Sequence, residues 1–187
     1  MEHKITISTF KKNGLCYAVG VSNSTNKIVR ISLPKSDEKE VINTISNHYP
    51  EFIISNKYED IARKMYDIYE GKKVNIYLDM FDLSVGKSNR ELPVKSHFMR
   101  QVLLETFKIP SWATETYKSI ALKLDSQAYR AVGTALAKNP FPLAIPCHRV
   151  VKSDHTIGKY GGGSEMKKRI LKKEGIKIKD NKVINNK

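Results

Sequence analysis

The sequence predicts an α+β fold, in which a small antiparallel sheet with helices precedes a mostly helical domain. In the first half, Ile5 and Ile7 alternate with polar residues, and the turn signal Asn13-Gly14 separates them from the next apolar run. In the second half, apolar residues recur at helical spacing, and a polar turn separates two short helical segments. A chain of 187 residues is long enough for two small domains.

The first 92 residues predict a scaffold rather than a chemical site, because they contain no motif with recognisable chemistry. Ser36 is the expected start of a helix whose first turn is acidic. Gly71 is the expected end of a second helix over residues 58–70. Strands are expected over residues 4–10, 15–21, 27–33 and 73–79.

The second half begins after a polar stretch, residues 83–93, that contains Gly and Pro. This stretch is the expected linker between one domain of residues 1–91 and another of residues 92–187. A helix is expected over residues 98–107, and two shorter helices follow with Asp125-Ser126 as the N-cap between them. On spacing alone, a helix-turn-helix and an ordinary αα-hairpin fit this pattern equally well.

The positive charge is concentrated in the second half of the chain. The formal net charge is +14, of which residues 1–92 contribute +2 and residues 93–187 contribute +12. Such a surface favours a polyanionic partner, and nucleic acid is the leading candidate because lysine and arginine neutralise phosphates. A lysine-rich surface without any ligand is the alternative, but it does not account for the asymmetry.

Several classes of protein are disfavoured by the sequence. It has no run of 18 apolar residues and no charged-then-apolar leader, so we expect neither a membrane partner nor secretion. Two cysteines, Cys16 and Cys147, make a poor disulfide framework and indicate a reducing cytoplasm. The sequence contains no CxxC pair and no HxxxH spacing, so we expect no metal site.

Cys147 lies in the one stretch whose composition predicts chemistry, residues 145–151. Three prolines stiffen the approach to it, and His148 and Arg149 follow it directly, a setting that favours the reactive thiolate. The alternative is that Cys147 is a small buried apolar residue. We expect residues 143–151 to form a strand, where neighbouring side chains point to opposite faces, so His148 would act through a water or a turn.

The residues around Cys147 resemble a known family. Pro146-Cys147-His148-Arg149-Val150 is similar to the active-site signature of the O6-alkylguanine-DNA alkyltransferases, also called methylated-DNA–cysteine methyltransferases. The resemblance covers residues 92–178, about half of the chain. Five more motifs occur in the order of that family: Phe98-Met99-Arg100-Gln101-Val102-Leu103, Tyr129-Arg130-Ala131-Val132-Gly133, Lys138-Asn139-Pro140, Tyr160-Gly161-Gly162, and Glu174-Gly175.

The resemblance implies a winged helix-turn-helix domain that binds double-stranded DNA containing O6-alkylguanine. Family members place the second helix in the minor groove, and the arginine that matches Arg130 fills the space left by the flipped nucleotide. The small residues of this helix suit close approach to the groove. Expected DNA contacts are therefore Arg130, Tyr117, Lys118, Ser126, Gly133, Ser153 and Met99.

The resemblance also implies a stoichiometric alkyl transfer by an intracellular, nucleoid-associated protein that needs no cofactor and works as a monomer. Cys147 attacks the alkyl carbon, His148 takes the thiol proton through a water, and Glu174 orients the imidazole. Tyr117 donates a proton toward N3 of guanine, and Asn139 fixes the turn before the cysteine. The expected base pocket is formed by Val150, Tyr160, Gly161 and Leu136.

Three other functions fit parts of the same pattern. A non-catalytic alkyltransferase-like damage sensor would bind the lesion without reacting, but such proteins lack the cysteine found here as Cys147. A winged-helix DNA-binding regulator would bind by sequence and would use Cys147 only for packing. A cysteine hydrolase would use Cys147, His148 and Glu174 repeatedly, but the sequence shows no oxyanion hole and gives the helix-turn-helix no purpose.

Overall fold

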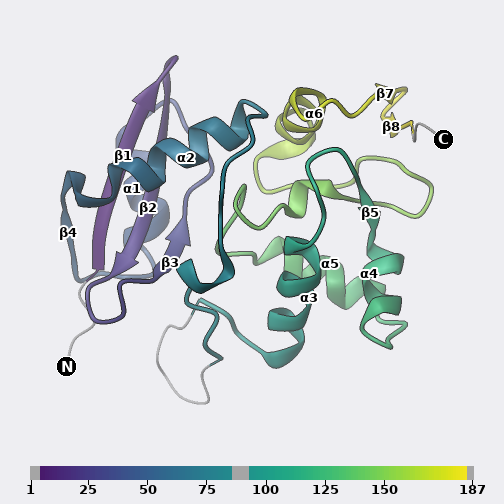
Figure 1. Ribbon diagram of the computed structural model, residues 1–187, viewed down its shortest axis with the longest axis horizontal. Helices are drawn as coiled ribbons and strands as arrows, with labels where there is room; N and C mark the ends of the chain where they lie inside the picture. Colours follow the sequence, from purple (N-terminus) through teal and green to yellow (C-terminus); the bar gives the residue numbers. More distant parts are fainter. Residues whose placement is uncertain (1–4, 86–92, 185–187) are drawn as a thin grey trace.

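The computed structural model describes residues 5–85 and 93–184 (Figure 1). The first half contains the strands β1 (Ile5–Lys12), β2 (Leu15–Ser22), β3 (Ile28–Ile31) and β4 (Phe52–Ile54). They form one sheet in the order β3-β2-β1-β4. The expected antiparallel meander of the first three strands is confirmed, whereas β4, which the sequence analysis missed, pairs in parallel with β1.

The two helices of the first half cover opposite faces of this sheet. Helix α1 (Glu38–Ser46) and helix α2 (Glu59–Tyr69) follow the expected helical segments. Because side chains alternate along a strand, Cys16 and Ala18 of β2 join the apolar cluster of α1, while Tyr17 joins the cluster of α2. Burial on both faces explains why β2 is almost entirely apolar.

The second half is mostly helical, and its order of elements follows the expected one. Helices α4 and α5 form the helix-turn-helix, and α3 packs on both of them. The short strands β5 and β6 pair in parallel, which joins the start of α4 to the segment after Cys147. The elements are α3 (His97–Phe107), β5 (Glu115–Thr116), α4 (Tyr117–Lys123), α5 (Tyr129–Ala137), β6 (Val150–Val151), α6 (Gly163–Lys173), β7 (Ile178–Lys179) and β8 (Lys182–Val183).

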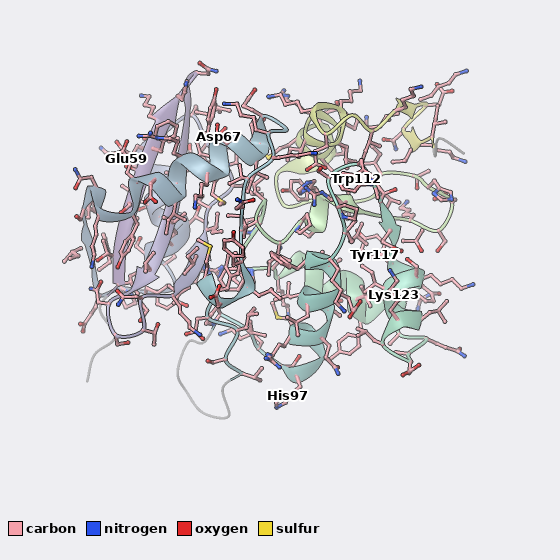
Figure 2. All side chains as sticks on the ribbon, in the orientation of Figure 1. Glu59, Asp67, His97, Trp112, Tyr117 and Lys123 are labelled. Carbon is pink, nitrogen blue, oxygen red and sulfur yellow. The ribbon has the colours of Figure 1, made fainter. Side chains whose placement is uncertain are left out.

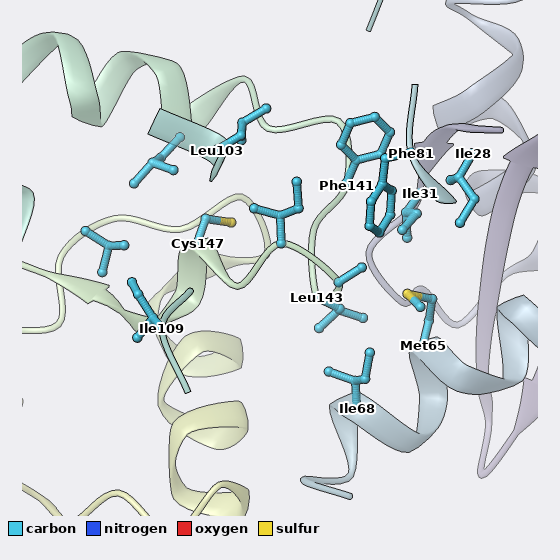
Figure 3. Packing of buried hydrophobic residues seen from close by; sticks show 14 of the residues in the cluster. Ile28, Ile31, Met65, Ile68, Phe81, Leu103, Ile109, Phe141, Leu143 and Cys147 are labelled. Atoms are coloured by element: carbon cyan, nitrogen blue, oxygen red, sulfur yellow. The ribbon is translucent and has the colours of Figure 1, made fainter. Parts of the chain in front are cut away.

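The two halves share one large apolar core, in which Phe81 of the first half packs on Phe141 of the second with ring centroids 4.9 Å apart. Figure 3 shows Cys147 and Ile109 on one side of this cluster and Ile28 and Met65 on the other. Backbone bonding also crosses between the halves, since Ile31 N–H donates to Pro140 at 2.8 Å. The expected boundary at residues 91 and 92 lies outside the described residues.

Two expected strands are wrong. Residues 73–79 form no ladder, and only a single bridge between Phe81 and Ile28 follows them, because Pro140 already occupies part of the edge of β3. Residues 143–149 turn instead of running straight: Leu143 has a φ of 71°, and Cys147 N–H bonds back to Ile145 at 2.8 Å. Only the last two residues of the expected strand, which form β6, are extended.

Three helix starts also differ from the expected ones. Asp37, not Ser36, caps α1 by accepting from the Lys39 amide. Asp125 adopts a φ of 50° in the turn of the helix-turn-helix, and the N-cap of α5 makes no side-chain hydrogen bond. The sequence also predicts a last helix capped by Ser164, whereas α6 begins one residue before that position, at Gly163.

Gly71 ends α2 as expected, and its position also sets how closely the two halves pack. Its φ is 76°, and the amides after the helix bond back to Ile68 and Asp67, the two bonds of a Schellman motif. A Cβ at this position would lie 2.2 Å from the carbonyl oxygen of Lys173 at the end of α6. Glycine is therefore required here for both its backbone conformation and its size.

The substitution Gly71→Ala should lower the free energy of unfolding by more than about 3 kcal/mol, because a strained φ is combined with a backbone clash. The matched control is Gly14→Ala, at a φ of 74° with nothing within 4 Å of the added Cβ. It should cost only about 1 kcal/mol. Urea denaturation measures both, and equal losses for the two variants would show that the contact with Lys173 is unimportant.

Candidate active site

Cys147 begins a short 3-10 helix, η3 (Cys147–Arg149), and only 8% of its surface is exposed. The turn before it is held by Asn139, whose side-chain amide donates to Ile145 at 2.9 Å. The Oδ1 of Asn139 accepts the Phe141 amide, also at 2.9 Å. The thiol thus lies on a rigid turn with an apolar surround.

Glu174 holds both residues that follow Cys147. Its carboxylate is at the end of α6 and is 1% exposed. His148 Nε2 lies 3.0 Å from Oε1, while Arg149 donates through Nε to Oε2 at 3.1 Å and through Nη2 to Oε1 at 2.6 Å. Arg149 Nη1 also donates to the Ile109 carbonyl at 2.6 Å. The glutamate therefore fixes the orientation of the imidazole and of the guanidinium together.

The protonation states in this group follow from burial and charge. Burial raises the pKa of Glu174, but hydrogen bonds from His148 and Arg149 outweigh it and leave the pKa below its ordinary value. Burial lowers the pKa of His148 below its ordinary value, against the opposing effect of Glu174. The imidazole is thus neutral at pH 7, donates Nε2–H to the carboxylate, and keeps a basic Nδ1. That Nδ1 is buried and has no partner among the described residues.

The thiol itself is not held as a thiolate. Burial raises the pKa of Cys147, and a hydrogen bond from Asn139 and the positive charge of Lys167 offset this only in part. The interpretation that its neighbours favour a resting thiolate is therefore wrong, because desolvation of the charged form is the larger effect. A thiol in this state needs a base to remove its proton before it can act as a nucleophile.

Lys167 is a site residue that the sequence analysis missed. It lies on α6, is fully buried, and donates from Nζ to the Val150 carbonyl at 2.6 Å. Burial lowers its pKa to about 8, so it still carries a positive charge at neutral pH near Cys147. A signal was present, since Lys167 is spaced three, four and seven residues from Ile170, Leu171 and Glu174, on the inner face of the helix.

Two tyrosines flank the thiol as neutral O–H groups. Tyr117 is the first residue of α4, which is held by a capping box between Thr116 and Ser119. It lies on the side of the molecule away from the sheet (Figure 2). Burial and the nearby Cys147 raise the pKa of Tyr117, and the same causes, in the same order, raise that of Tyr160 strongly. The Tyr160 hydroxyl is buried without a partner among the described residues.

The structure sorts the expected DNA contacts into surface and core. Met99 is 3% exposed and packs in the main core, so the expectation that its side chain contacts DNA is wrong. The burial follows from its place on α3, one turn before Leu103 on the face that meets the other helices. The remaining positions are exposed or half-buried: Arg130, Lys118 and Ser153 exposed, and Tyr117, Ser126 and Gly133 half-buried.

Two of the four residues expected to form the base pocket lie in the core of the protein. The side chains of Leu136 and Val150 belong to the main core, and the Val150 carbonyl already accepts from Lys167. A carbonyl oxygen has two lone pairs, so it can accept a second donor. Gly161 is exposed, and a Cβ there would lie 3.4 Å from Leu33 of the first half.

Comparisons with known proteins show the family of the chain. Residues 97–176 match the family model for the DNA-binding domain of 6-O-methylguanine DNA methyltransferase. The methylated-DNA–protein-cysteine methyltransferase of Methanocaldococcus vulcanius is 38% identical over 164 residues, which are 86% of this chain and 93% of that protein. The chain belongs to the methylated-DNA–protein-cysteine methyltransferase family.

Two further comparisons bear on the extent of the likeness. The family member of Methanothermobacter thermautotrophicus is 37% identical over 105 residues, which span 56% of this chain and 59% of that protein. The crystal structure of the Pyrococcus kodakaraensis O6-methylguanine-DNA methyltransferase is 24% identical, covers 92% of this chain and 99% of that one, and has a TM-score of 0.68. At that identity the structural match shows that the fold is shared.

Membrane-spanning helices and metal-binding clusters are both absent from the described residues. Within residues 5–85 and 93–184, no helix is long and apolar enough to cross a membrane. In the same residues, no group of three or more His, Cys, Asp or Glu side chains is arranged to hold a metal ion.

Proposed function

We propose that this protein repairs DNA by moving the alkyl group of O6-alkylguanine, chiefly methyl, onto its own Cys147. The observation that carries the proposal is a buried thiol next to a neutral imidazole, His148, whose proton-accepting nitrogen is free while Glu174 holds the other. This pair lies behind an exposed helix-turn-helix in the basic half of the chain. Membership of the family suggests the reaction, and a thiol with a neighbouring base is the arrangement that this reaction needs.

The reaction requires the damaged base to leave the helix, because the alkyl carbon is otherwise enclosed in the base stack. Helix α5 enters the minor groove, where its small residues permit close approach. Arg130 is exposed near the start of this helix and takes the place of the flipped nucleotide. Lys118, Ser126 and Ser153 contact the flanking phosphates, which set the register of the protein on the duplex.

The flipped guanine lies between Tyr160, the Gly161 backbone and the Cys147 turn. The carbonyls of Cys147 and Val150 accept from its exocyclic amine, and Leu136 supports the pocket from the core. Lys167 holds the Val150 carbonyl in place with its 2.6 Å hydrogen bond. The Tyr160 hydroxyl, buried without a partner among the described residues, is available to the base or its O6.

The transfer is a direct displacement at the alkyl carbon. The bond from Cys147 Sγ to carbon forms as the bond from carbon to O6 breaks, and the electron pair of that bond stays on guanine. The thiol proton passes through a water to His148 Nδ1, and Glu174 stabilises the imidazolium. Tyr117 protonates N3 of guanine and regains a proton, through water, from the imidazolium of His148, so that in net terms the thiol proton ends on the base. The product is a thioether without a ready leaving group, so each molecule reacts once.

The organisation of the chain around this reaction is part of the proposal. Residues 1–91 form a scaffold domain and residues 92–187 the domain that binds DNA and carries the cysteine. One-time attack by a single thiol needs no second subunit, so a monomer is sufficient. We infer that the protein acts on the chromosome in the cytoplasm, in keeping with the free cysteines Cys16 and Cys147.

The test is peptide mass spectrometry after the protein is mixed with a duplex that carries one O6-methylguanine. One methyl group should appear on the peptide that contains Cys147, with an equal amount of guanine restored. The variant Cys147→Ala should lose transfer and keep duplex binding, whereas Cys16→Ala, which changes the other buried cysteine, should keep both. Binding without methyl gain would indicate a damage sensor, and repeated turnover would indicate a hydrolase; either would refute the proposal.

A second prediction concerns Gly133 in the middle of α5. A Cβ there would lie 3.9 Å from the Tyr117 ring, an ordinary contact, so the protein itself does not need glycine at this position. Gly133→Ala should stabilise the fold by up to about 1 kcal/mol, because alanine favours the helix. It should weaken duplex binding roughly tenfold if the helix enters a narrow groove. Unchanged binding, measured by fluorescence anisotropy, would contradict this docking of the helix.

A further inference from the structure

The last described residues form a small hairpin outside the recognised domain. The family match ends at residue 176, and β7 and β8 follow it as an antiparallel pair. Asp180 and Asn181 connect them with φ values of 49° and 62°, as in a type I′ turn. We call residues 177–184 the C-terminal hairpin. It lies beside α6, on the far side of the molecule from the sheet (Figure 1).

The C-terminal hairpin is fixed to the segment that follows the cysteine motif, residues 152–159, here called the wing loop. Val183 N–H donates to His155 at 2.9 Å, and Ile157 N–H donates to Asn181 at 3.1 Å. A separate apolar cluster joins the two segments through Val183, Ile157, Val151, Leu171 and Ile176. Both hydrogen bonds and apolar packing therefore hold the hairpin against the wing loop.

The wing loop, in turn, lies against the group that the proposed function places at the DNA. Strands β5 and β6 pair directly before Tyr117 and directly before Lys152. A Cβ on Gly158 would lie 3.6 Å from both the Tyr117 hydroxyl and Lys152 Cγ. Ser153, an expected phosphate contact, is exposed on the same loop. The hairpin thus contacts the wing loop, and the wing loop in turn contacts Tyr117 on the expected DNA-binding surface.

The C-terminal hairpin adds positive charge at this position. Lys177, Lys179 and Lys182 are exposed, against one acid, Asp180. None of the three lysines makes an ion pair with another described residue. The carboxylate of the wing loop, Asp154, accepts from the Thr156 amide and hydroxyl, and these hydrogen bonds, together with the positive charges of Lys182 and Lys152, lower its pKa.

We propose that the C-terminal hairpin is a second DNA-contacting element, which extends the phosphate contacts of the wing loop along the duplex beside the lesion. The inference rests on the proposed function, because it takes the helix-turn-helix and wing loop as the DNA-facing side. Its ligand is the sugar-phosphate backbone of double-stranded DNA, independent of sequence. The lysines neutralise phosphates and release counterions, so they contribute affinity that falls with salt.

The experiment replaces all three lysines in the variant K177Q/K179Q/K182Q and measures binding to an undamaged duplex between 50 and about 300 mM salt. The slope of log affinity against log salt should become less steep by roughly 2 to 3, about 0.9 for each lost phosphate contact. Affinity near 0.1 M salt should fall roughly tenfold or more. The matched control, K27Q/K39Q/K57Q, removes the same charge from exposed positions of the first half and should change neither quantity.

Methyl transfer from the free base O6-methylguanine separates this inference from the proposed function. The hairpin variant should react with the free base at the rate of the unaltered protein, because no duplex is bound. An unchanged salt slope, or an equal change in the control, would overturn the hairpin proposal. A lost free-base reaction in the variant alone would also overturn it, by showing that the hairpin supports the active site. No reaction of the unaltered protein with base or duplex would instead refute the proposed function.

Discussion

The site depends on one buried carboxylate. Glu174 is 1% exposed, and it joins the end of α6 to His148 and, through Arg149, to the carbonyl of Ile109 after α3. Removing a carboxylate from water is costly, and several hydrogen bonds from buried partners are needed to offset that cost. The glutamate also opposes the helix dipole at its position. Arg149 compensates for this, whereas Lys173 pairs with Glu70 in the first half. The same contacts thus stabilise three segments and select one tautomer of His148.

Burial has two consequences for the nucleophile. It raises the pKa of Cys147, which keeps the thiol protonated and protects it from oxidation before a substrate arrives. It also lowers the pKa of His148, which keeps the imidazole available as a base. Lys167 moderates the first effect, since a positive charge near Cys147 favours the thiolate that forms during transfer. Under the proposed single transfer, this arrangement reserves the reactivity of the thiol for the bound lesion.

The helical spacing in the sequence was sufficient to place α2, α3, α4 and α5, and the motif order indicated the family. Local patterns could not reveal the turn at Leu143, because a φ of 71° in a non-glycine residue is imposed by packing around Phe141 and Ile145. The contact between Arg149 and Glu174 spans 25 residues and arises only when α6 packs on η3. For Met99 the resemblance to the family was misleading, because it suggested a DNA contact for a side chain that lies in the core. Asp180-Asn181 is a turn signal for the hairpin of β7 and β8, which the sequence analysis missed.

The claim on which the account depends most is that His148 is a neutral base with its proton on Nε2. The direct measurement is the ¹⁵N chemical shifts of the imidazole between pH 5 and 8, with the signal assigned by its loss in His148→Asn. The account predicts a neutral ring protonated at Nε2 at pH 7, and charging only below the ordinary histidine pKa, because burial lowers it. A charged imidazole at pH 7, or a neutral ring with the proton on Nδ1, would contradict the proposed proton transfer from Cys147.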